Sequence, residues 1–484
     1  MSTTVLSTQP SVRTTGERYP GVAAHQLVDG IARIIDLCLI LVTGILAYAF
    51  RAQSFAIDER SMMALAIAVL LAVNVFSLFK LYDPPRLGSL MYQLPRLLGA
   101  WCTTMGGTLV VTFLLATSSD LSRLWIVFWF AAGGLGLGLS RIGLKAWIEG
   151  AQRSGELTRN IFVIGTAARG LACSKQLEGP DQSIRVIRRL DIADLVEADA
   201  PNKLSMVGVR TLGEALLARR IDHVAIALPP ERMALLPSLV RALRYFPVEV
   251  GLVPEAPPAG LPVLGVKQVG NVPSVTLLEK PLDGWHYVIK AVEDRILAGT
   301  ILTFIAPFML CIGLAVRLTS PGPALFRQKR LGFNQQMVDV FKFRTMYVDH
   351  CDKPLSAEVV QATRGDPRVT PVGRFLRRTS LDELPQLVNV LRGEMSLVGP
   401  RPHAVAHDRY YAELIDGYLG RHRVKPGITG WAQVNGCRGE TRTLHEMHRR
   451  VELDLYYIDH WSLLLDLRII LRTLLVGFTH NKAY

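Results

Sequence analysis

The chain has 484 residues, a formal net charge of +13 and a hydrophobic content of 50%, with a mean hydropathy of +0.27. That hydropathy is high for a soluble protein, and a basic membrane protein usually places such charge near anionic lipid and in cytoplasmic loops. No recognition-helix or zinc pattern supports nucleic-acid binding, and six scattered cysteines without a CxxC support neither a disulfide framework nor a zinc site.

Four apolar stretches follow a polar N-terminal tail, residues 1–30, and each has about the twenty residues that cross a bilayer. They cover residues 34–50, 62–79, 97–116 and 124–144. Arginine and lysine concentrate in the tail, in the second connecting loop and after the fourth stretch. The positive-inside bias therefore predicts a four-helix transmembrane domain, residues 31–150, with both ends in the cytoplasm. Buried helices of a soluble domain are the less favoured alternative.

An α/β domain is predicted for residues 158–270. Buried strands are expected at IFVIG, VAIAL and VEVGLV, and a Pro/Gly-rich stretch, Pro254 to Pro262, leads out of its core. The first strand runs into a turn that keeps Gly165 and Gly170 of a dinucleotide fingerprint but has Ala167 at its central position. We therefore expect a degenerate Rossmann-like domain that binds no dinucleotide and serves in assembly or regulation.

A fifth apolar segment covers residues 296–318 and has Pro307 near its middle, where it removes a backbone hydrogen bond and kinks or breaks a helix. Both flanks are basic, so a helix that crossed the bilayer would place one cluster outside. These observations favour a re-entrant hairpin that keeps both flanks in the cytoplasm. Its broken backbone would have to be satisfied by neighbouring protein.

The stretch VFKFRTM, if it is a strand, places Lys342 and Arg344 on one face about 7 Å apart. That spacing suits the two phosphates of a diphosphate. A solvated strand face explains the pair equally well.

Adjacent carboxylates, Asp382 and Glu383, follow Arg377 and Arg378 and precede Arg401. Ser380 and Glu383 have the spelling of a helix capping box, but Pro385 disfavours that register, so we expect the helix to start at or after Asp382. Two neighbouring carboxylates repel unless a cation shares the site, and Mg²⁺ binds through one or two carboxylates plus substrate phosphates. The arginines could hold phosphoryl oxygens, and an Asp can attack phosphorus directly.

The strings SPGPALFRQKRLG, FKFRTM, RRTSLDELPQLVNVLRGEMSLVGPRPH, VKPGITGWAQVNG and ELDLYYI lie between about residue 288 and the C-terminus. This region resembles the catalytic domain of the monotopic polyprenyl-phosphate phosphoglycosyl transferases, the bacterial sugar transferases. The preceding domains and a GCRGET-like stretch resemble the long members, of which the undecaprenyl-phosphate glucose phosphotransferases of exopolysaccharide biosynthesis are the most similar.

The resemblance implies a fold of four transmembrane helices, a Rossmann-like middle domain and a re-entrant α/β catalytic domain, residues 285–484, with C-terminal amphipathic helices. It implies transfer of a hexose 1-phosphate, glucose by family likeness, from a UDP-sugar to undecaprenyl phosphate, with release of UMP. The enzyme would lie in the bacterial inner membrane with its catalytic domain on the cytoplasmic face.

The site residues are also carried over from the resemblance. Asp382 is the expected nucleophile, and Glu383 would help to hold Mg²⁺ and assist the lipid phosphate. The residues expected to bind substrate or phosphate are Lys342, Arg344, Arg377, Arg378, Arg401, Gln433 and Asp454. At the helix break Ala306 precedes Pro307 where many members have serine, which leaves the geometry of the break open.

Several alternatives remain open from the sequence. Galactose could replace glucose, and a membrane assembly scaffold without activity would need no intact site. A nucleotide-sugar dehydratase is disfavoured because residues 160–280 contain neither an intact glycine fingerprint nor a Tyr-x-x-x-Lys pair. A homodimer through the membrane or middle domain is compatible with the sequence, since the middle domain has no other evident task.

Overall fold

The computed structural model describes residues 24–82, 87–115, 122–154, 157–178, 184–197, 200–218, 221–253, 265–269, 272–347, 366–437, 439 and 443–477. The expected tail before residue 24 and the stretch from Pro254 to Pro262 lie outside these ranges. Two compact units divide at residues 158 and 159, close to the predicted end of the transmembrane domain.

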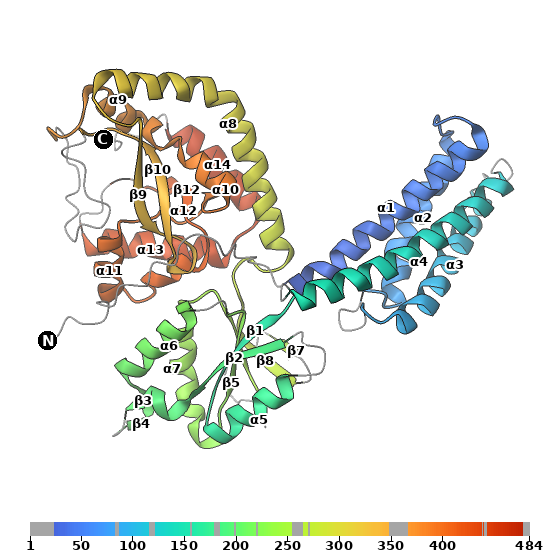
Figure 1. The fold of residues 1–484 in the computed structure, drawn as a ribbon, viewed down its shortest axis with the longest axis horizontal. Coiled ribbons are helices and arrows are strands. Elements are labelled where there is room, and N and C mark those ends of the chain that lie inside the picture. The colour runs from blue at the N-terminus through green and yellow to red at the C-terminus, as the bar shows by residue number, and fades with distance from the viewer. Residues whose placement is uncertain are drawn as a thin grey trace. The chain divides into compact units, whose positions relative to one another are not determined.

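The first unit consists of four helices, in agreement with the four apolar stretches (Figure 1). They are α1 (Ala24–Ala52), α2 (Glu59–Leu78), α3 (Leu90–Leu114) and α4 (Arg123–Arg153). Each is long and apolar enough to cross a membrane. Helix α1 begins ten residues before the predicted apolar stretch (34 − 24), because its first turns carry polar residues that a hydropathy pattern does not assign to a span.

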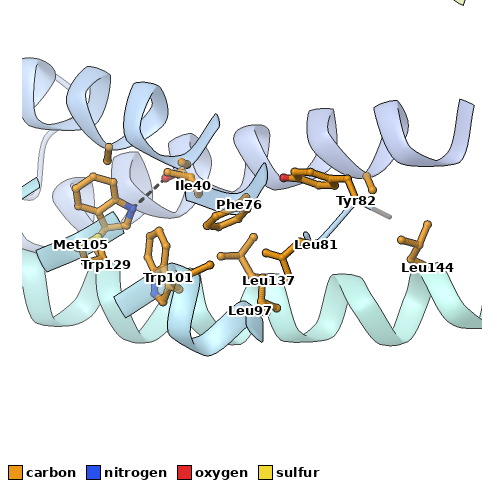
Figure 2. Close-up of a cluster of buried hydrophobic side chains, with 14 of the residues drawn as sticks. Ile40, Phe76, Leu81, Tyr82, Leu97, Trp101, Met105, Trp129, Leu137 and Leu144 are labelled. Atoms are coloured by element: carbon orange, nitrogen blue, oxygen red, sulfur yellow. Dashed lines mark hydrogen bonds between the residues drawn. The ribbon is translucent and has the colours of Figure 1, made fainter. Parts of the chain in front are cut away.

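Indole rings organise the core of this bundle, which Figure 2 shows in close-up. Trp129 Nε1 donates to the carbonyl of Ile40 at 3.0 Å and Trp125 Nε1 to that of Gly44 at 2.9 Å. Because lipid cannot satisfy polar groups, these bonds fix α4 against α1. At one end a buried ion pair joins Arg141 to Asp36 at 2.6 Å, and the Tyr82 hydroxyl donates to the same carboxylate.

The middle domain contains a six-stranded sheet in the order β2-β1-β5-β6-β8-β7. Its parallel strands are β1 (Arg159–Gly165), β2 (Ile184–Asp191), β5 (His223–Ala227) and β6 (Glu249–Leu252), and β7 (Gly265–Val269) and β8 (Val272–Leu278) extend it antiparallel. Short strands β3 (Val196–Glu197) and β4 (Ala200–Leu204) pair separately. The helices are α5 (Ala167–Leu177), α6 (Met206–Ala218) and α7 (Leu236–Leu243), with 3-10 turns η3 (Ile192–Leu195) and η4 (Pro230–Leu235).

All three predicted strands of this domain are present, as β1, β5 and β6. Gly165 ends β1 where a Cβ atom would lie 2.5 Å from the carbonyl oxygen of Ala227, so strand packing alone requires glycine there. Arg169 donates to the carbonyl of Leu228 at 2.7 Å, at the carboxyl end of the sheet where such folds usually bind ligands. Both contacts are compatible with a domain that binds no dinucleotide. The absence of dinucleotide binding stays a prediction.

The C-terminal domain, for which the sequence predicts a catalytic role, begins with the long helix α8 (Trp285–Thr319). A hairpin of β9 (Leu325–Leu331) and β10 (Met337–Phe343) follows, with the turn η5 (Phe333–Gln335) between the strands. The remaining elements are α9 (Pro371–Thr379), η7 (Leu381–Glu383), α10 (Gln386–Arg392), β11 (Ser396–Val398), α11 (Val405–Leu414), η8 (Tyr418–Arg423), β12 (Gly427–Thr429), α12 (Trp431–Val434), α13 (Leu444–Asp459) and α14 (Leu463–Gly477). Strands β11 and β12 pair in parallel.

Helix α8 is continuous through Ala306 and Pro307, so the favoured prediction of a broken backbone at these residues is wrong. Figure 1 shows that α8 bends along its length, as expected where a proline removes one backbone hydrogen bond. Ala298, before the proline, packs in the core that contains Leu387 of α10. Ile312, after it, packs with Phe343 of β10. Both halves of α8 therefore contact one catalytic domain.

Candidate active site

The carboxylate pair lies in a short turn between two helices. Ser380 has φ +56° and is the left-handed C-cap of α9. It also precedes the turn η7, but its side chain makes no cap hydrogen bond there, so the capping box does not form. Asp382 and Glu383 belong to the 3-10 turn η7, and α10 begins at Gln386 after Pro385. The prediction that the helix starts at or after Asp382 is confirmed, and the pair precedes its first turn.

Glu383 is held by two cations from distant parts of the chain. Lys342, on β10, donates to Oε1 at 2.8 Å. Arg401, three residues after β11, donates Nη1 to Oε2 at 2.9 Å and Nη2 to Oε1 at 2.5 Å. Burial alone would raise the pKa of Glu383, but Arg401 and Lys342 outweigh it and hold that pKa well below its usual range. Glu383 is therefore ionised throughout the physiological range.

Asp382 has the opposite character. Among the described residues it has no hydrogen-bond or ion-pair partner, although it is only partly exposed. Burial and the neighbouring Glu383 carboxylate raise the pKa of Asp382 to about 6, against the opposing effect of Lys342, Arg377 and Arg401. The turn thus combines a fixed anion with an uncommitted carboxylate whose pKa is raised toward neutrality. Such a separation is expected of two carboxyl groups with different roles.

The two arginines of α9 differ in environment. Arg377 Nε donates to Thr345 Oγ1 at 2.9 Å, and its charge lowers the pKa of Asp382, so it faces the pair. Arg378 is exposed and is free to reach a ligand from solvent.

Arg344 is committed elsewhere. Strand β10 ends at Phe343, and the 3%-exposed Arg344 donates to the carbonyls of Ser320, at 2.8 Å, and Pro321. These carbonyls follow the last turn of α8, where backbone acceptors lack intrahelical partners. The structure thus gives Arg344 a capping task at the end of α8, while Lys342 reaches Glu383.

Asp454 lies behind the site. It is buried on α13 and accepts from Arg421 Nε at 2.8 Å, and Arg421 Nη2 donates to the backbone carbonyl of Arg401 at 2.7 Å. Asp454 therefore positions Arg401 through Arg421. No contact of its own with the carboxylate pair is recorded among the described residues.

Gln433 lies on α12, directly after β12. Its Nε2 donates to the carbonyl of Ile428 at 3.3 Å, and its Oε1 is buried with no partner among the described residues. Neighbouring turns approach closely here, since a Cβ on Gly427 would lie 2.1 Å from the amide of Gly399. The glycines of the SLVGPRP and KPGITG strings thus allow the two segments to meet beside Arg401.

Sequence reasoning missed Asn389, which fixes the turn against the hairpin. Asn389 is fully buried on α10, accepts from the amide of Phe341 at 3.0 Å and donates to the carbonyl of Asp339 at 2.8 Å. Because Asn389 both accepts from and donates to the backbone of β10, it fixes the distance between Lys342 on that strand and Glu383. An asparagine within an apolar helix pattern was the available signal.

Comparisons with known proteins identify the family of the chain. The family model described as "Bacterial sugar transferase" matches residues 285–480, and one described as "CoA-binding domain" matches residues 77–254. The chain belongs to the bacterial sugar transferase family.

Among its relatives, a UDP-glucose:undecaprenyl-phosphate glucose-1-phosphate transferase of Xanthomonas campestris pv. campestris is 37% identical over 461 residues, 94% of this chain and 95% of the relative. An Escherichia coli K12 protein of the same description is 40% identical over 78% of this chain and 81% of its own length. A UDP-N-acetylgalactosamine-undecaprenyl-phosphate N-acetylgalactosaminephosphotransferase of Aeromonas hydrophila is 38% identical over 42% of this chain and 47% of its own length.

Proposed function

We propose that this protein transfers glucose 1-phosphate from UDP-glucose to undecaprenyl phosphate and releases UMP, as the first membrane step of a polysaccharide assembly pathway. The observation that carries the proposal is the arrangement at η7. One carboxylate is ionised by Lys342 and Arg401, and the other, Asp382, has no partner in the described structure. Relatives that match 94% and 78% of the chain share this named activity.

In the first step an Asp382 carboxylate oxygen attacks the β-phosphorus of the UDP-sugar. A new oxygen–phosphorus bond forms, the bond from that phosphorus to the bridging oxygen breaks, and UMP leaves with the bridging oxygen. The enzyme then carries glucose 1-phosphate as an acyl phosphate. Lys342, Arg377 and Arg401 surround the reacting group and would stabilise charge on the diphosphate.

In the second step an oxygen of undecaprenyl phosphate attacks the same phosphorus. The bond to Asp382 breaks, the carboxylate is regenerated and a lipid diphosphate sugar is released. Because each substrate reacts with the enzyme in turn, the proposal requires ping-pong kinetics.

Mg²⁺ is proposed to bind at Asp382 and Glu383 with the donor's phosphates. The described residues contain no cluster of three or more His, Cys, Asp or Glu side chains that could hold a metal, so substrate oxygens would have to complete the shell. Both Glu383 oxygens accept from Lys342 and Arg401, which leaves Asp382 as the free protein oxygen donor. This set fits the usual Mg²⁺ pattern of one or two carboxylates plus phosphates. The bound cation would neutralise charge on the diphosphate.

The membrane arrangement is proposed from the contacts of α8. As a straight helix its 35 residues would measure about 52 Å, more than a bilayer core needs. Contacts of both halves with one catalytic domain support a re-entrant path instead. Exposed apolar side chains near its middle, such as Phe304 and Leu310, would face lipid, and so would Leu464 and Leu471 of α14. The catalytic domain would then lie on the cytoplasmic face of the inner membrane.

The test is UMP release by the purified full-length protein in nanodiscs with undecaprenyl phosphate, Mg²⁺ and either UDP-glucose or UDP-galactose. The proposal expects lipid-dependent turnover with UDP-glucose that is lost in Asp382→Asn. Turnover with UDP-galactose alone would assign galactose, not glucose, as the transferred sugar. Retained turnover in Asp382→Asn would refute the assignment of Asp382 as the nucleophile. A folded protein that releases no UMP from either donor would refute the proposed activity.

A further inference from the structure

Arg330 is a cation close to the carboxylate pair whose role the chemistry above leaves unassigned. It lies on β9 opposite Val338 of β10 and forms an isolated bridge with Ala404. That bridge brings the end of β9 alongside the segment that carries Arg401. The sequence shows Arg330 only as one of several basic residues after α8.

The guanidinium of Arg330 lacks a carboxylate partner. Its one hydrogen bond within the described structure is from Nη2 to Gln328 Oε1 at 2.6 Å, and no acid of the described ranges lies within ion-pair distance. Burial, then repulsion from Arg401, lowers the pKa of Arg330 to about 10. Two like charges that approach each other in a partly buried site cost free energy unless an anion joins them.

The acids close enough to influence Arg330 are already engaged. Glu383 accepts three hydrogen bonds from Lys342 and Arg401. Asp408 accepts from the Tyr418 hydroxyl at 2.7 Å and lies beyond ion-pair distance of Arg330. Within the described residues no acid is left to pair with Arg330, so an anion supplied by a ligand could fill this place.

The local charge agrees with this conclusion. Lys342 and Arg401 bond Glu383, and Arg377 and Arg330 add two further positive charges near these groups, against the negative charges of Asp382 and Glu383. An excess of about two positive charges suits a second phosphoryl group in addition to the one that reacts. A guanidinium has five N–H donors, of which Arg401 uses two on Glu383. Arg330 could therefore bind phosphate oxygens through two parallel hydrogen bonds, and Arg401 could add a remaining donor.

We propose that Arg330 and Arg401 form a second phosphate subsite beside the carboxylate pair, occupied by a non-reacting phosphoryl group of a substrate. This inference rests on the proposed transferase function and deepens it. Two sources have the required chemistry: the α-phosphate of the UDP-sugar, and the phosphate of the polyprenyl acceptor before it attacks. The subsite would align whichever phosphate it holds with the Asp382–phosphorus bond that forms or breaks.

The two half-reactions distinguish these sources. Full-length wild type, Arg330→Gln and Arg330→Lys are compared in nanodiscs. The donor arm measures UMP released in a single burst from UDP-glucose without lipid, and the acceptor arm measures loss of the enzyme-bound phosphosugar after addition of undecaprenyl phosphate. The matched control is Arg327→Gln, because Arg327 lies on the same strand, is exposed and packs over the ring of Phe341.

Loss of charge-assisted hydrogen bonds to one phosphate predicts an increase of about 10- to 100-fold in the concentration of that substrate needed for half-maximal rate. Arg330→Lys should recover part of the loss. A defect confined to the donor arm assigns the subsite to the α-phosphate, and one confined to the acceptor arm assigns it to the lipid phosphate.

Unchanged concentration dependence in both arms, with Arg330→Gln equal to Arg327→Gln, would overturn the proposal. If Arg330→Gln does not fold, Arg330→Lys replaces it. The proposal would then be overturned if Arg330→Lys needed the same concentration of each substrate as wild type for half-maximal rate. Failure of the wild type itself to release UMP would instead refute the proposed function.

Discussion

The raised pKa of Asp382 leads to a quantitative prediction for the pH profile of the first half-reaction. Only the ionised carboxylate can attack phosphorus, and burial together with Glu383 places the pKa of Asp382 at about 6. At pH 5 about one-tenth of this carboxyl would be ionised, compared with about nine-tenths for a carboxyl with a pKa of 3.8. The rate should therefore fall about tenfold per pH unit below pH 6.

Removal of Arg377 should move this profile in a definite direction. The charge of Arg377 lowers the pKa of Asp382, so Arg377→Gln should raise the midpoint. A nearby opposite charge lowers an Asp pKa by about 1 to 3 units, and the partial exposure of Arg377 favours the lower end, about one pH unit. The matched control is Arg374→Gln, on an exposed position one turn earlier in α9.

The assay is kcat/KM for UMP release from UDP-glucose between pH 4.5 and 8, at several Mg²⁺ concentrations. Extrapolation to zero Mg²⁺ is needed because a bound cation favours the ionised carboxylate and lowers the midpoint. A midpoint near 4, or a variant midpoint that does not rise in Arg377→Gln, would refute the assigned electrostatics of Asp382.

Three further predictions concern stability. The folded-state pKa of Asp382 lies above its unfolded value, so its ionisation opposes folding increasingly as pH rises from about 4 through 6. Asp382→Asn should therefore melt at a higher temperature than wild type at pH 7.5, by an amount equivalent to about 1–3 kcal/mol. At pH 4 the two proteins should melt at the same temperature. Asn389→Ala should destabilise the protein by about 2–4 kcal/mol, measured by denaturation in detergent, because the amide of Phe341 loses its buried acceptor. Arg141→Met should cost about 3–5 kcal/mol, because the buried Asp36 loses its ion-pair partner and keeps only the Tyr82 hydroxyl as a donor. The additional change Asp36→Leu should restore much of this loss; an additive double variant would argue against the ion pair.

Patterns with a strong physical period predicted most of the fold. Four apolar stretches of bilayer length became helices, and three apolar runs bounded by turns became the parallel strands β1, β5 and β6. The antiparallel strands β7 and β8 were missed. The Pro/Gly-rich stretch before them was taken to lead out of the core, and the predicted domain ended at residue 270, whereas the sheet continues to Leu278.

The site was predictable in its residue types and less so in its contacts. Local sequence placed Asp382 and Glu383 near a helix start, but it could not show that Lys342 and Arg401 both engage Glu383 and leave Asp382 free. Strand alternation placed Arg344 on the face of Lys342, yet the strand ends at Phe343 and Arg344 turns toward the carbonyls after α8. These contacts join residues far apart in the sequence, and a local pattern does not predict such long-range packing.

The covalent intermediate on Asp382 is the central claim, and peptide mass spectrometry tests it most directly. Wild-type protein is incubated with UDP-glucose and Mg²⁺ without lipid, quenched, and digested under conditions that preserve acyl phosphates. The account predicts a hexose-phosphate adduct on the peptide that contains Asp382, its discharge by undecaprenyl phosphate, and its absence in Asp382→Asn. UMP release without any adduct, or an adduct on another residue, would contradict it.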